Sequence, residues 1–190
     1  MPIDRQAFFD VMASFPSGVA IVTTTTEDGE PRGLTTTAVC SISAEPPTVL
    51  VSVDLGSRTL AALRERRAFA VNFIGAGRSD LCLLFASKGH DKFGDVPWRA
   101  GETGLPILHD DALAWAECTT VHELEVGDHV LLIGLVEEGG VRPELEPPLL
   151  YYRRSWGVWS PVHEADDGEP VAIRAIEVSG RDLRWQGAEF

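Results

Sequence analysis

Short runs typical of β-strands recur along this chain, separated by turn residues, and this alternation is the strongest constraint on its fold. The runs are rich in Val, Ile, Thr and Phe, and Gly, Pro and Asp bound them. We expect strands at residues 19–26, 33–43, 48–54, 68–74, 112–121, 129–137 and 149–153. Links of hairpin length and few helices favour an antiparallel barrel or sandwich, mainly β with flanking helices, over a doubly wound parallel fold.

The sequence predicts further details for several of these segments and for the links between them. The run at 33–43 is long enough to need a bend or bulge in a curved sheet. The near-continuous apolar run at 48–54 suits a strand that is covered on both faces. Residues 122–128 should form a loop, and residues 87–106 a glycine-rich surface excursion. We expect one domain at 1–161, followed at 162–190 by an acidic linker (162–170) and a C-terminal arm in which 171–178 alternates like a strand.

Three helices are expected. The first spans residues 4–15, where apolar side chains recur at helical spacing behind an Asp4 cap: Phe8, Val11, Met12 and Phe15. The second opens at residues 57–59 and has leucines and alanines on its apolar face. The third spans residues 79–86, with Ser79 as its N-cap.

Charge and cysteine usage exclude several classes of function. With 16 Lys and Arg against 29 Asp and Glu, the net charge of −13 repels nucleic acid and anionic membrane surfaces. An anion-binding site would need locally placed donors. Three widely spaced cysteines, Cys40, Cys82 and Cys118, form neither a redox pair nor a disulfide framework and favour a cytoplasmic location. The N-terminus lacks the pattern of an export signal, and no apolar run is long enough for a membrane helix.

The common catalytic motifs are absent from the sequence. Gly75 and Gly77 begin like a dinucleotide fingerprint, but Asp80 stands at the third glycine position and no parallel βαβ unit surrounds them. The five histidines are scattered, so we expect no metal site. A catalytic unit assembled in space stays open, because such units are not visible as spacing along the chain. An enzyme of this kind often borrows its chemistry from an organic cofactor.

Three segments carry features that suit a nucleotide. Hydroxyl and thiol groups at residues 35–37 and 40–41 can face a planar polar ring, although threonines also fill the solvent face of ordinary strands. Residues 54–59 place Gly, Ser, Arg and Thr at a helix N-terminus, where a phosphate is attracted, although a plain serine cap has the same sequence. Residues 85–93 mix basic and aromatic side chains in a loop that can clamp a nucleotide.

Six ordered motifs between residues 8 and 161 together resemble the flavin reductase family. They are FPSGV at 15–19, GLT at 33–35, SIS with a following PP at 41–47, SRTL at 57–60, KG with DKF at 88–93, and GDH at 127–129 with Gly134. The resemblance implies a split-barrel, FMN-binding fold in a homodimer. It also implies that NADH or NADPH reduces FAD or FMN and that the reduced flavin passes to a separate monooxygenase.

The same resemblance assigns expected binding residues. The isoalloxazine ring and ribityl chain should be lined by Thr35, Thr36, Thr37, Ala38, Cys40 and Ser41. The flavin phosphates should meet Asp54, Ser57, Arg58 and Thr59. The rest of the nucleotide should lie by Phe85, Lys88, Gly89 and Phe93. Beside the nicotinamide we expect the catalytic His129, oriented by Asp128.

Two features leave room for other interpretations. The family often has Asn-Ser where this chain has Thr37 and Ala38, so one side-chain donor to the flavin is missing or replaced by backbone. Tyr151 and Arg153 contact either the dinucleotide or a dimer partner, or Tyr151 simply packs. Few arginines suit a 2′-phosphate, which favours NADH. The alternatives are an oxidase that retains its flavin, as pyridoxamine phosphate oxidases do, and a non-catalytic flavin or haem carrier.

Overall fold

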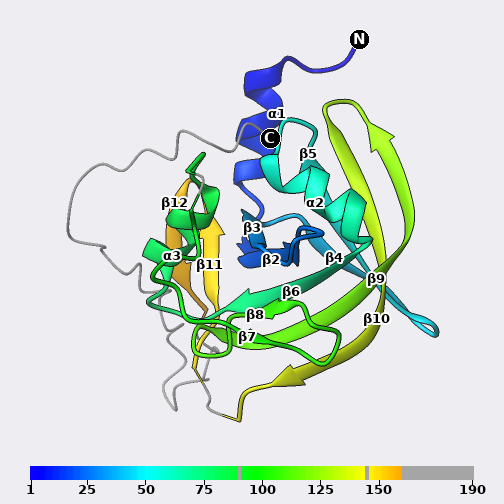
Figure 1. Ribbon diagram of the computed structural model, residues 1–190. Coiled ribbons are helices and arrows are strands. Elements are labelled where there is room, and N and C mark those ends of the chain that lie inside the picture. The colour runs from blue at the N-terminus through cyan, green and yellow to red at the C-terminus, as the bar shows by residue number, and fades with distance from the viewer. Residues whose placement is uncertain (90, 144–145, 160–190) are drawn as a thin grey trace.

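A seven-stranded antiparallel sheet forms the body of the molecule in the computed structural model, which describes residues 1–89, 91–143 and 146–159 (Figure 1). The strand order is β3-β2-β6-β9-β10-β5-β4. The strands are β2 (Ala20–Thr25), β3 (Pro31–Thr36), β4 (Val39–Ala44), β5 (Pro47–Asp54), β6 (Ala68–Ile74), β9 (Ala112–Val126) and β10 (His129–Val141). The prediction of a mainly β, antiparallel chain with few helices is confirmed.

The two edge strands of this sheet, β3 and β4, follow one another directly in the chain. Only Thr37 and Ala38 separate them, so the sheet must curl until its edges approach each other. The link is fixed on one side, because Ser52 N–H donates to the Ala38 carbonyl at 3.1 Å. In the described part of the chain β3 pairs only with β2 and β4 only with β5, so the barrel stays open. The bend expected within 33–43 is this link.

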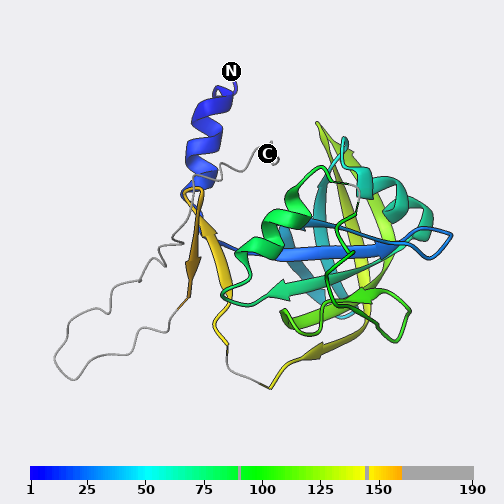
Figure 2. The ribbon, with the colours of Figure 1, turned by 60° about the vertical axis from the view of Figure 1, so that its left-hand side comes forward.

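Two smaller sheets complete the fold. One contains β1 (Ser17–Gly18), β11 (Leu149–Tyr152) and β12 (Ser155–Val158), and the other pairs β7 (Arg99–Ala100) with β8 (Pro106–Ile107). Figure 2 shows the β11–β12 hairpin beside the end of α1 (Arg5–Ala13). The contact includes a hydrogen bond of 2.9 Å from Arg153 N–H to the Ala13 carbonyl. Leu149 of this hairpin packs in one cluster with Ile21 of β2 and Leu81 of α3 (Ser79–Ala86).

The helices begin at local capping signals, with one exception. The Asp4 side chain accepts from Ala7 N–H in α1, and Ser57 accepts from Thr59 N–H in α2 (Arg58–Arg66). The cap expected at Ser79 is wrong: α3 (Ser79–Ala86) includes Ser79 in its first turn, and no side-chain bond caps it. None of these helices, in the residues described, is long and apolar enough to cross a membrane.

Helix α2 covers one end of the barrel and completes its core. Leu60 and Leu63 of α2 pack with Val22, Val51 and Phe69 from the strands. Because burial of such side chains is the main favourable term in folding, this cluster holds α2 in place. It thereby fixes the helix N-terminus beside the edge strand β3.

The structure departs from the sequence-based expectations at two strands. Strand β9 continues to Val126, through the segment expected as a loop, because residues 122–126 remain paired with β10. Arg64 of α2 also holds this extension by ion pairs to Glu123 and Glu125. In β5 only Val51 and Val53 are fully buried, so this strand alternates instead of being covered on both faces. The predicted linker at 162–170 and strand at 171–178 lie outside the described residues.

A buried carboxylate, that of Glu117 in β9, organises the turn between β7 and β8. Its side chain is 1% exposed and accepts hydrogen bonds from the backbone N–H groups of Glu102 (3.0 Å) and Thr103 (2.8 Å) and from the Thr103 hydroxyl. Buried charges are tolerated where several donors satisfy them. The Glu117 carboxylate therefore provides the hydrogen-bond acceptors that water would otherwise provide to the N–H groups of this turn.

Replacing Glu117 by Gln should destabilise the protein. The amide presents one N–H₂ group to donors that need an acceptor, so we expect a loss of about 2 kcal/mol in the free energy of unfolding. Urea denaturation measures this loss. Glu138 lies opposite Glu117 in β10 and is exposed, so Glu138→Gln serves as the control and should change stability by less than about 0.5 kcal/mol. Equal effects of the two substitutions would contradict this account.

Candidate functional site

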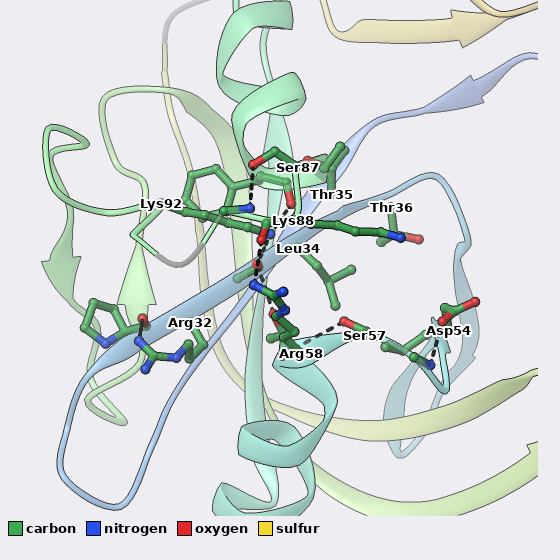
Figure 3. Close-up of a pocket in the computed structure, with 18 of the residues that line it drawn as sticks. Arg32, Leu34, Thr35, Thr36, Asp54, Ser57, Arg58, Ser87, Lys88 and Lys92 are labelled. Atoms are coloured by element: carbon green, nitrogen blue, oxygen red, sulfur yellow. Dashed lines mark hydrogen bonds between the residues drawn. The ribbon is translucent and has the colours of Figure 1, made fainter. Parts of the chain in front are cut away.

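A cavity of about 940 Å³ lies along the free edge of β3. Its walls come from β3 and the link to β4, the end of β5, the N-terminus of α2, the C-terminal end of α3 with the segment after it, and the first residue of β10. Figure 3 shows side chains from these separate segments around a common space. Because β3 pairs on one side only within the ranges that the structure describes, this wall offers backbone groups that are outside the sheet ladder.

The N-terminus of α2 forms one end of the cavity. Asp54 accepts from Gly56 N–H at 2.6 Å and so shapes the turn that precedes the helix. The Ser57 hydroxyl caps Thr59 N–H at 3.3 Å. Arg58 reaches across the cavity and donates to the Lys88 carbonyl at 2.7 Å. The free N–H groups of a first helical turn and the positive end of its dipole attract an anion, and a phosphate is the expected one.

Strand β3 and helix α3 form the opposite wall and are joined by side-chain bonds. The Thr35 hydroxyl donates to the Cys82 carbonyl of α3 at 2.7 Å. The rings of Phe85 and Phe93 meet edge to face, with centroids 4.9 Å apart. The only hydrogen of the Thr35 hydroxyl is thus already used within the fold, so toward a ligand this hydroxyl can only accept.

Cations outnumber carboxylates at this cavity in an otherwise acidic chain, although Glu30, Asp54 and Asp91 also line it and Glu30 pairs with Arg32. Four cations line it: Arg32, Arg58, Lys88 and Lys92. The chain contains only two lysines, and both are in this group. Desolvation by burial, and then the nearby charge of Arg58, lower the pKa of Lys92 to about 8. Such a concentration of donors favours an anionic ligand.

His129 lies at the margin of the cavity, at the start of β10. It pairs with Asp54 of β5 on one side and with Val126 of β9 on the other. Its Nδ1 donates to the Asp128 carboxylate at 2.7 Å, and this hydrogen bond lowers the pKa of Asp128. With Nδ1 held in this way, Nε2 is the ring nitrogen that can meet a ligand.

The structure brings most of the expected binding residues together. Those that line the cavity are Thr35, Thr36, Thr37, Ala38, Asp54, Ser57, Arg58, Thr59, Phe85, Lys88, Gly89, Phe93 and His129. Asp128 contacts the cavity only through His129.

Four expected residues lie elsewhere. Cys40 and Ser41 are exposed on β4, because the chain leaves the cavity after Ala38 to reach the other edge of the sheet. Tyr151 and Arg153 belong to the separate hairpin, where Tyr151 packs on Trp156 with ring centroids 5.0 Å apart. These four do not line the cavity formed by the described residues of one chain.

Sequence reasoning missed Arg32 and Ser52, which line the cavity, and it included Ser87 and Lys92 only as part of the segment 85–93 without assigning them a contact. Lys92 stands inside the DKF motif, and the presence of both lysines within five residues was a usable signal. Arg32 precedes the GLT motif by one residue. Ser52 gave no signal, since its place depends on how β5 approaches the Ala38 link.

Comparison with known proteins shows which family the chain resembles. Residues 12–160 match the flavin reductase like domain. The chain is 45% identical over 163 residues to a flavin reductase (NADH) of Kitasatospora aureofaciens, with 85% of each chain covered. It is 40% identical over 152 residues to a flavin reductase (NADPH) of Lentzea aerocolonigenes, covering 80% of this chain and 88% of that protein. It is 34% identical over 181 residues to the reductase subunit HsaB of a flavin-dependent monooxygenase of Mycobacterium tuberculosis, covering 92% and 96%.

A solved structure shares the fold as well. The NADH:FAD oxidoreductase SgcE6 of Streptomyces globisporus C-1027, in complex with NAD and FAD fragments, superposes with a TM-score of 0.77. The two sequences are 31% identical, and the match covers 83% of this chain and 94% of that one. By the extent of these matches and by its fold, the chain belongs to the flavin reductase like domain family.

Proposed function

We propose that this protein is a flavin reductase, which transfers a hydride from a nicotinamide nucleotide to FAD or FMN and releases the reduced flavin to a partner monooxygenase. The observation that carries the proposal is the cation-rich cavity, which combines a helix N-terminus with a free strand edge in a chain of net charge −13. The names of the relatives support the same reaction.

The cavity can supply what this reaction needs from a protein. Hydride passes from nicotinamide C4 to flavin N5 without a protein nucleophile, so the site has to hold two rings in contact and stabilise negative charge. Ser57, Arg58 and Thr59 would hold the flavin phosphates at the start of α2. The backbone of residues 35–38 would face the isoalloxazine edge where charge develops. His129 would meet the nicotinamide carboxamide through Nε2.

The cofactor preference is part of the proposal. We propose NADH as the hydride donor, although relatives named for NADH and for NADPH are both similar to the chain. Either FAD or FMN meets the chemical requirements of the cavity. We also propose a cytosolic location, because the three cysteines form no disulfide and thiols stay reduced in the cytosol.

Turnover with and without added flavin tests the activity. We expect rapid loss of NADH absorbance only when FAD or FMN is added to the purified protein, because the reduced flavin leaves. Protein that keeps a flavin through purification and oxidises NADH slowly would favour the oxidase alternative. No NADH oxidation with either flavin would contradict the proposal and favour a carrier.

Arg58→Ala should weaken flavin binding and leave the fold intact. A lost charge-assisted contact to phosphate raises the KM for FMN by about tenfold or more, with kcat changed by less than about twofold. Steady-state kinetics with varied FMN measure this. Arg66 lies at the other end of α2, outside the cavity, and provides the control variant Arg66→Ala. An unchanged KM in Arg58→Ala would contradict the phosphate assignment.

His129→Ala should impair the nicotinamide step selectively. Loss of its contact is expected to slow hydride transfer or to raise the KM for NADH by about tenfold, because one hydrogen bond contributes roughly 1 kcal/mol or more. Single-turnover kinetics with bound flavin separate these effects. The exposed His122 of β9 gives the control His122→Ala. Normal single-turnover rates at saturating and subsaturating NADH would refute the role of His129.

A homodimer is also proposed. Apolar side chains share the outer face of the barrel: Leu131 of β10 lies opposite Leu124 of β9, and Ile133 lies opposite Leu50 of β5. Leu124 and Val126 are 59% and 52% exposed. An apolar face of this kind on an acidic protein supports association with a second copy.

Light scattering after gel filtration measures the oligomeric state. We expect twice the mass of the chain for the wild type, and a shift toward monomer for Leu124→Arg, because a charge would be placed in an apolar interface. Val141→Arg, at the exposed far end of β10, is the control and should remain dimeric. A monomeric wild type would end the proposal.

A further inference from the structure

We propose that Lys92 is a positioning residue, which ties the end of α3 to the free edge of β3 and so fixes the wall against which the flavin binds. The inference rests on the proposed function, since it concerns the same cavity. It gives Lys92 a role in binding that does not depend on contact with a phosphate.

Lys92 forms hydrogen bonds to two separate elements of the fold. Its Nζ donates to the Phe85 carbonyl at 2.7 Å and to the Gly33 carbonyl at 3.2 Å. Phe85 belongs to the last turn of α3, and Gly33 belongs to the edge strand β3. The Thr59 hydroxyl of α2 donates to the same Gly33 carbonyl at 3.0 Å. Helix α2 and the segment after α3 therefore meet at one carbonyl of β3, which pairs with β2 alone among the strands described.

The backbone and side chains at this junction are closely packed. A Cβ on Gly33 would stand 2.7 Å from Cε1 of Phe85, so the strand and the ring are already in close contact. Phe93, which follows Lys92, packs edge to face on the same ring. When its two bonds are lost, the hydrogen bond from Thr35 to the Cys82 carbonyl and the packing of Phe85 still hold α3 on β3. The C-terminal end of α3, where the Phe85 carbonyl loses its partner, should then open more often.

The chemistry of the ammonium group suits this place. Two of its three N–H groups are engaged with carbonyls, which leaves one for any other partner. The chain uses arginine for 14 of its 16 Lys and Arg residues, but a planar guanidinium is too wide to replace a compact ammonium between two carbonyls. The lowered pKa agrees with this half-buried position. The other charged groups around the cavity are Glu30, Arg32, Asp54, Arg58, Lys88 and Asp91.

The comparison of riboflavin with FMN separates a positioning residue from a phosphate ligand. Riboflavin carries the same ring and ribityl chain as FMN but no phosphate. A residue that binds phosphate contributes only to the binding of FMN, whereas a residue that holds the wall contributes equally to both flavins.

The test uses the whole protein with Lys92→Met, which keeps the length of the side chain and removes its donors. We expect the KM values for riboflavin and for FMN to rise by the same factor, about tenfold, with kcat changed by less than about twofold. Arg58→Ala provides the contrast: Arg58 also holds the Lys88 carbonyl, but its loss should raise the KM for FMN by a clearly larger factor than the KM for riboflavin. Lys92→Arg should not restore the wild-type KM values.

Two results would overturn the inference. A penalty confined to FMN would make Lys92 a phosphate ligand, and unchanged KM values for both flavins would give it no part in binding. Hydrogen exchange of the protein without flavin supplies a second measurement, in which Lys92→Met should speed exchange at the C-terminal end of α3 by about tenfold. Unchanged exchange there would also contradict the junction. This measurement stands even if the wild type reduces no flavin, so the two proposals fail separately.

Discussion

The two edges of the main sheet are consecutive in the chain, and the rest of the structure depends on this constraint. A link of two residues, Thr37 and Ala38, has to carry the chain from β3 to β4. The sheet curls to bring its edges within that reach, but β3 and β4 do not pair with each other among the described residues. The opening that remains exposes the backbone of β3, and α2, α3 and the segment after α3 gather at it. The proposed binding site is thus the cavity at the place where the barrel stays open.

Electrostatics then selects what can enter this opening. The overall charge of −13 keeps anions away from most of the surface, whereas four cations and a helix N-terminus attract them at one place. The Asp128–His129 pair lies at the margin of the cavity, where β5 ends and β10 begins. Binding and orientation are the tasks that this arrangement performs, in agreement with a reaction in which both reactants are nucleotides.

Local signals predicted more of the fold than of the site. Asp4 and Ser57 mark helix starts correctly because an N-cap acts within three residues. The end of β9 was missed because the exposed, largely polar segment 122–126 resembles a loop until its pairing with β10 is known. The sequence predicts Cys40 and Ser41 beside the flavin ring, because a run of hydroxyl residues does not show where the strand turns away from the cavity. The contacts of Lys92 join residues 7 and 59 positions apart, and no local pattern specifies them.

The use of arginine almost everywhere has a practical consequence for handling this protein. Reagents that modify primary amines, such as activated esters on dyes, resins or crosslinkers, find side-chain targets only at Lys88 and Lys92, both in the wall of the cavity. Immobilisation by amine coupling therefore blocks the binding site or relies on the N-terminal amine. A tag or label for this protein belongs on Cys40, the one exposed thiol, which lies outside the cavity.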